Sequence, residues 1–91
     1  MLIKTQDNKT IINIESVNKI CVNDNYKDGK AIVYAYFNYN ERTELGRYEN
    51  SERAMKILDS IGVRYEEIER SRFFRMEEAN FVIPTFNMPE N

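Results

Sequence analysis

The feature that most constrains this chain is a change of hydrophobic period between Leu45 and Leu58. Before it, apolar and polar residues alternate as in a β-strand, and after it apolar residues return every three or four positions as in a helix. Asn50 or Ser51 can accept a hydrogen bond from the free amides of a first helical turn. Glu52 places a negative charge at the positive end of that turn. The sequence therefore predicts a strand that leads at once into a helix beginning near Ser51.

The predicted helix has one apolar face. Its apolar positions are Ala54, Ile57, Leu58 and Ile61, and the charged positions between them are Glu52, Arg53, Lys56 and Asp59. Side chains at three- and four-residue spacing share one side of a helix, so the charged groups point away from that side. Because such a face needs cover from another element of the fold, we expect the helix to pack on a sheet.

Gly62 leaves two outcomes for the far end of this helix. It can end the helix as a left-handed cap, or it can be carried through at a cost of about 1 kcal/mol. Tyr65 and Ile68 partly extend the apolar face, and Glu66 stands four residues before an arginine, which is a favourable charge spacing. We expect a kinked helical region to about Glu78, while the stretch from Arg64 to Asn80 can be either helix or arm.

Five segments before the helix have strand character. They are Leu2 to Gln6, Thr10 to Ile14, Val17 to Val22, Lys30 to Asn38 and Thr43 to Tyr48. The second segment is apolar on both sides, which favours a position inside a sheet. Gly46 in the fifth segment marks a bulge or a close approach to the helix. Between Asn80 and Met88 a last strand or arm is expected, and Pro84 places it at a sheet edge because proline donates no ladder hydrogen bond.

These elements predict an α+β fold. We expect an antiparallel β-meander of about five strands packed against one helix, kinked or straight, with a C-terminal edge strand or arm. The 91 residues form a single domain, residues 1–91, because a chain of this length supports one core.

Composition excludes several classes of function. The chain has no histidine and a single cysteine, Cys21, so it cannot form a cysteine and histidine metal site, an internal disulfide or a serine–histidine pair. Its formal net charge of −2 disfavours non-specific nucleic-acid binding. No apolar run approaches the length of a membrane span. We therefore expect a cytoplasmic protein that is not an enzyme, binds no cofactor or metal and does not enter a membrane.

One segment near the end of the helix combines cations with aromatic rings. Its residues are Arg70, Arg72, Phe73, Phe74 and Arg75. Arginine holds phosphate or carboxylate with two donors, and aromatic rings stack on bases or anchor protein interfaces. Glutamates on both sides can instead neutralise the arginines along a solvated helix. The segment is a candidate contact for a protein or for an anionic ligand.

Two tyrosines form a second candidate site. Tyr34 and Tyr36 share one face of the strand from Lys30 to Asn38, while the opposite face is also apolar. One interpretation is a central strand covered by the helix on one side and by loops or the tail on the other. The alternative is an aromatic surface that meets a second subunit.

Four short motifs resemble a group of short proteins from low-GC Gram-positive bacteria, their prophages and phages. They are the opening Leu2 to Asp7, Leu45-Gly46-x-Tyr48, Glu52-Arg53-Ala54 followed by Ile57-Leu58-Asp59-x-Ile61, and Phe86-x-Met88-Pro89. The stretch from Arg64 to Asn80 is extra in this chain. The resemblance carries over no catalytic residue, and it implies a phage or prophage accessory protein.

We therefore expect a small non-catalytic protein that binds and blocks a protein partner, such as a host-defence factor. The alternative is a sponge, formed as a homo-oligomer, that sequesters an anionic nucleotide signal through the arginines and an aromatic ring. Both hypotheses use the same cationic and aromatic segment, so the sequence does not separate them.

Overall fold

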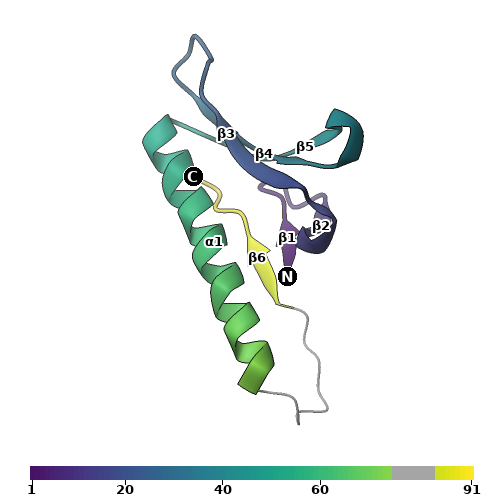
Figure 1. Ribbon diagram of the computed structural model, residues 1–91. Coiled ribbons are helices and arrows are strands. Elements are labelled where there is room, and N and C mark those ends of the chain that lie inside the picture. Colours follow the sequence, from purple (N-terminus) through teal and green to yellow (C-terminus); the bar gives the residue numbers. More distant parts are fainter. Residues whose placement is uncertain (75–83) are drawn as a thin grey trace.

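A computed structural model describes residues 1–74 and 84–91, without the side chains of residues 72–74. Two three-stranded sheets pack with one helix, which confirms the α+β class (Figure 1). In chain order the elements are β1 (Leu2–Lys4), β2 (Ile11–Asn13), the 3₁₀ turn η1 (Ile14–Ser16), β3 (Lys19–Asn23), β4 (Ala31–Tyr36), the 3₁₀ turn η2 (Asn38–Asn40), β5 (Arg42–Tyr48), α1 (Ser51–Phe74) and β6 (Thr85–Asn87). The expected meander is present as β3, β4 and β5.

The β3-β4-β5 sheet is antiparallel throughout, with β4 at its centre. Its pairing with β5 shifts by one residue, because Val33 lies opposite Gly46 while Tyr34 lies opposite Glu44. Leu45 is therefore the extra residue of a β-bulge, and it is buried. The bulge expected at Gly46 is thus present one residue earlier, at Leu45. Gly46 itself makes a close approach, but to a ring and not to the helix: a Cβ there would lie 2.6 Å from the Tyr48 hydroxyl oxygen.

The second sheet has the order β2-β1-β6. β6 pairs in parallel with β1, so the C-terminal segment is an edge strand, as predicted. The expectation that the second strand lies inside a sheet is wrong, because among the described strands β2 pairs with β1 alone and forms the edge of the sheet. Burial explains the difference: Ile12 is buried, whereas Ile11 is more than half exposed, so only one face of β2 is covered.

Gln6 joins the two sheets. Its backbone amide donates to the Leu45 carbonyl oxygen at 2.8 Å. Its side chain then completes the link, since Arg47 N donates to Gln6 Oε1 at 2.8 Å and Gln6 Nε2 donates to the Arg47 carbonyl oxygen at 3.0 Å. The side-chain amide thus pairs with the edge of β5 as a strand backbone would.

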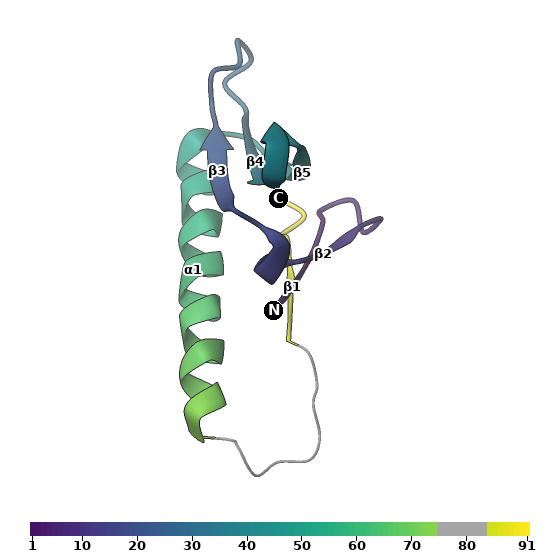
Figure 2. The ribbon, with the colours of Figure 1, turned by 45° about the vertical axis from the view of Figure 1, so that its right-hand side comes forward.

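Helix α1 begins where the sequence predicts. Of the two candidate caps, Asn50 is the N-cap, because its Oδ1 accepts from Arg53 N at 2.8 Å. Ser51 instead donates its hydroxyl to Asp24 Oδ2 in the loop before β4. The helix runs through Gly62 without ending and reaches Phe74 (Figure 2). The rest of the stretch expected to be helix or arm lies outside the described residues.

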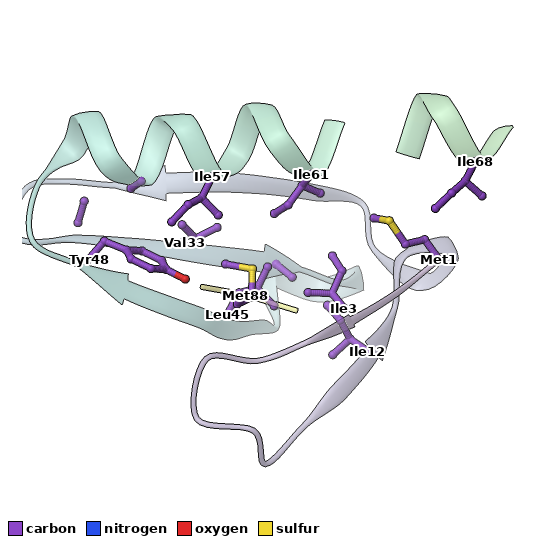
Figure 3. Close-up of a cluster of buried hydrophobic side chains, with 13 residues drawn as sticks. Met1, Ile3, Ile12, Val33, Leu45, Tyr48, Ile57, Ile61, Ile68 and Met88 are labelled. Atoms are coloured by element: carbon purple, nitrogen blue, oxygen red, sulfur yellow. The ribbon is translucent and has the colours of Figure 1, made fainter. Parts of the chain in front are cut away.

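The core lies between α1 and the two sheets. Ile57 and Ile61 point from the helix toward Val33 (Figure 3). Met88, which follows β6, enters the same cluster, so the C-terminal segment is held by packing as well as by pairing. Tyr48 is also in the cluster, and its hydroxyl donates to the Pro89 carbonyl oxygen at 2.9 Å.

Replacing Gly62 by alanine is expected to stabilise the protein. Outside the helix backbone, no described atom lies within 4 Å of the position that a Cβ would take. Alanine should therefore raise the free energy of unfolding by about 0.5–1 kcal/mol, measured by urea denaturation. Gly29→Ala is the matched control: φ is +76° at Gly29, so alanine there should destabilise. A loss of stability in Gly62→Ala would contradict the finding that there is open space for a Cβ at this position.

The buried Tyr48 hydroxyl predicts a loss of stability at high pH. Burial raises the pKa of Tyr48 to about 12. A tyrosine pKa raised by folding contributes stability that is intact below about pH 10 and is lost as the pH rises toward 12. Tyr48→Phe should lower stability at neutral pH by about 1 kcal/mol and should flatten the decline above pH 10. Denaturation at several pH values measures both effects, and an unchanged slope would contradict the assignment.

Candidate binding surface

The two faces of β4 have different cover. Ala31, Val33 and Ala35 point inward to the core below α1 and are fully buried. Ile32, Tyr34 and Tyr36 alternate with them and point to the other side of the sheet. The strand register places neighbours from β3 and β5 on that side. We call this side the outer face, and its strand positions are Lys19, Cys21, Asn23, Ile32, Tyr34, Tyr36, Arg42, Glu44 and Arg47.

Rings and cations interlock on the outer face. The Tyr34 and Tyr36 rings meet edge to face, with centroids 6.3 Å apart and planes at 62°. The Arg42 guanidinium lies over the Tyr34 ring, 4.3 Å from its centroid, and Lys19 Nζ lies 4.8 Å from the centroid of Tyr36. Arg42 Nη1 also donates to the Tyr36 hydroxyl oxygen at 3.5 Å. Both cations are thus held by aromatic rings.

The loop between β3 and β4 adds a third tyrosine. Tyr26 and Tyr34 share a hydrogen bond between their hydroxyls at 3.1 Å. This bond is the main reason that the pKa of Tyr34 is raised above its ordinary value, with burial next. Although no described helix covers this side, Tyr34 is only 7 % exposed and Ile32 only 2 %. The outer face is therefore a packed surface of its own.

The outer face is more positive than the chain as a whole. Its three cations, Lys19, Arg42 and Arg47, stand against one carboxylate, Glu44, giving 3 − 1 = +2, while the whole chain has a net charge of −2. Glu44 pairs with Arg47 at 3.1 Å. Within the described part of the chain, no carboxylate lies within ion-pair distance of Lys19 or Arg42. These two cations are available to an external anion.

Tyr39 lies at the tip of the β4–β5 hairpin. Its side chain is 96 % exposed, and its backbone is left-handed, with φ 65° and ψ 30°. This conformation is uncommon for a bulky residue, and the next residue, Asn40, also has a positive φ of 63°. A large aromatic side chain held out in solvent on a strained turn is a feature of contact sites.

Among the described side chains, the sequence-predicted site residues lie on two different parts of the fold. Tyr34 and Tyr36 lie on the outer face of β4. Arg70 is exposed on α1, which packs against the opposite face of the sheet. Arg72, Phe73 and Phe74 belong to α1 by backbone, but their side chains lie outside the described residues, as does the whole of Arg75. The contact role of that segment stays a prediction.

A shallow groove runs between α1 and the start of β3. It has a volume of about 270 Å³ and is lined by Ile14, Val17, Asn18, Lys19, Ile20, Leu58, Ile61, Gly62 and Tyr65. Its lining offers apolar contact and no pair of acid and base groups, so it has the character of a packing surface. Among the described residues, no three histidine, cysteine, aspartate or glutamate side chains come close enough to hold a metal ion.

No described helix is both long enough and apolar enough to cross a membrane.

Comparison with protein-family models, with curated proteins and with solved structures finds no match for this chain. The candidate surface therefore rests on geometry alone. Sequence reasoning found Tyr34 and Tyr36 through strand alternation, but it missed Tyr26, Tyr39, Lys19 and Arg42. Alternation could have placed Lys19 and Arg42 on one side of their strands, whereas their alignment with Tyr36 depends on register.

The hydroxyl bond between two tyrosines gives a direct test of the outer face. Tyr26→Phe removes the bond, so the pKa of Tyr34 should fall toward its ordinary value. Tyrosine ¹³C chemical shifts followed across alkaline pH would report each ring separately. Tyr39→Phe is the matched control. Because Tyr39 is almost fully exposed, this substitution should leave the titration of Tyr34 unchanged. An unaltered Tyr34 titration in Tyr26→Phe would contradict this contact.

Proposed function

We propose that this is a non-catalytic binding protein that holds a protein partner against the outer face. The observation that carries the proposal is the network of Tyr34, Tyr36, Lys19 and Arg42 on the side of the sheet that the described helix leaves uncovered. Tyrosine and arginine are the residues most enriched in the energetic centres of protein interfaces. Two rings already packed against cations lose little side-chain freedom on binding.

Tyr39 supports the same proposal from the rim of this surface. An exposed ring is unfavourable in water, and a left-handed backbone adds strain at a residue with a large side chain. A partner that covers the ring would recover the first of these costs. The hairpin tip directly follows β4, so we propose that a partner on the outer face also contacts the Tyr39 ring.

The biological setting of the proposal comes from the resemblance to short phage and prophage proteins. A protein of this kind acts by occupying its target, so a host-defence factor in the cytoplasm is the partner class that we propose. Binding would block the target without any chemical step, which fits a surface built from tyrosines and cations.

Affinity capture with paired variants tests the proposed surface. The full chain and a Tyr36→Ser, Tyr39→Ser variant would be used as baits in a low-GC Gram-positive host, and captured proteins would be identified by mass spectrometry. A partner captured by the unmodified chain would then be purified and its Kd measured. The variant should bind at least about tenfold more weakly, since anchor residues at interfaces each contribute about 2 kcal/mol or more.

The matched control for this experiment is Val63→Ser. Val63 is an apolar side chain on α1 that is 57 % exposed, so its replacement removes apolar surface far from the outer face. It should leave the Kd unchanged. Equal binding by the unmodified chain and by the tyrosine variant, with both folded by circular dichroism, would remove the outer face as the contact.

The nucleotide sponge is the second proposal from the sequence, and it makes a separate prediction. A ligand at 100 times its Kd stabilises a folded protein by about 2.7 kcal/mol. If the protein partner is the true target, a thermal-shift panel of cyclic and linear nucleotides should leave Tm unchanged. A clear rise in Tm that is lost in Arg70→Gln would favour the sponge instead.

A further inference from the structure

Three residues form a row across the outer face. Lys19 of β3 is the register partner of Tyr36 of β4, and Tyr36 is in turn the partner of Arg42 of β5. We propose that this row binds carboxylates of an acidic segment of the partner protein, an inference that rests on the proposed function. Tyr36 is the centre of the site, and one cation flanks it on each side.

The geometry of the row leaves its donors free. Arg42 donates one N–H to the Tyr36 hydroxyl oxygen at 3.5 Å, so the hydroxyl is an acceptor in that bond and keeps its own proton to donate outward. Guanidinium carries five N–H donors, and the other donors of Arg42 meet no carboxylate among the described residues. Lys19 likewise keeps its three donors. The hydroxyl and both cations can therefore act on the same anionic segment.

The rings fix both cations before any anion arrives. Arg42 is stacked 4.3 Å from the Tyr34 centroid, and Lys19 sits 4.8 Å from that of Tyr36. Long cationic side chains ordinarily lose rotamer freedom when they pair, which weakens exposed ion pairs. Cations already held over rings lose less of it. This is a built site rather than a scatter of surface charge.

Charge and spacing favour an acidic protein segment over a single compact anion. Adjacent strands lie about 4.8 Å apart, so the two cationic strands are separated by about 10 Å. The two cations lie over two different rings, Lys19 over Tyr36 and Arg42 over Tyr34. This separation suits carboxylates spaced along a peptide. Glu44 does not neutralise the row, because it pairs with Arg47 at 3.1 Å. The net charge of +2 on this face gives an acidic segment a local attraction, which acts within about one Debye length although the whole chain has a net charge of −2.

A peptide titration tests the proposal on the full chain. The probes are two blocked peptides, one of alternating Glu and Ala and one of alternating Gln and Ala, followed by ¹H–¹⁵N NMR. The Glu peptide should shift the amides of Lys19, Tyr36 and Arg42, and the shifts should weaken as salt is added. Arg42→Gln and Lys19→Gln should each raise its Kd by about tenfold, and Tyr36→Phe by a few-fold.

Arg64→Gln is the matched control, since it removes an arginine from α1 and should leave the Kd unchanged. Dispersed NMR spectra establish that each variant is folded. Equal binding of the Glu and Gln peptides would overturn the proposal. Shifts confined to the groove beside α1 would overturn it as well, as would a row that responds to inorganic phosphate and not to the Glu peptide.

The failure of this site is distinguishable from failure of the proposed function. A captured partner can bind through Tyr36 and Tyr39 while Lys19→Gln and Arg42→Gln leave its Kd unchanged. That result would overturn the carboxylate site and would keep the outer face as the contact surface. If binding is insensitive to the tyrosines as well, both proposals fall.

Discussion

The packing of α1 on the inner face of β4 is the contact on which the rest of the structure depends. Ala31, Val33 and Ala35 are fully buried there, and two of these are alanines, so the helix can approach the sheet closely. Ile57 of the helix points toward Val33 and is buried in the same cluster (Figure 3). In the part of the chain that the structure describes, the one helix covers one side of β4. That limit decides which surface is left for binding.

The other side of β4 must then be covered by its own neighbours. Ile32 and Tyr34 are buried without belonging to the main core, and the covering groups come from β3, β5 and the loop that carries Tyr26. A guanidinium stacked on Tyr34 shields the ring and keeps its own charge in contact with water. The contact that stabilises this side of the sheet therefore also makes it a surface of aromatic rings and exposed cations.

Local chemistry could be predicted from the sequence, and long-range pairing could not. Asn50 caps the helix through an amide only three residues away, so the change of period was sufficient to place its start. The division into two sheets depends on Gln6 reaching Arg47 and on β6 pairing with β1, and no local signal specifies either contact. The same limit explains why Tyr36 was found as a candidate while its alignment with Lys19 and Arg42 was missed.

The bulge in β5 connects the core to the charge of the outer face. Without an extra residue, strict alternation would place Leu45 on one side of β5 and both Glu44 and Gly46 on the other. Leu45 stays on the core side, and the bulge moves Tyr48 to the core side as well. It also brings Arg47 to the same side as Glu44, where the two form an ion pair. Because Arg47 occupies the one carboxylate of this face, Arg42 is left to the rings of Tyr34 and Tyr36. A single inserted residue thus satisfies the core and keeps a cation unneutralised on the binding surface.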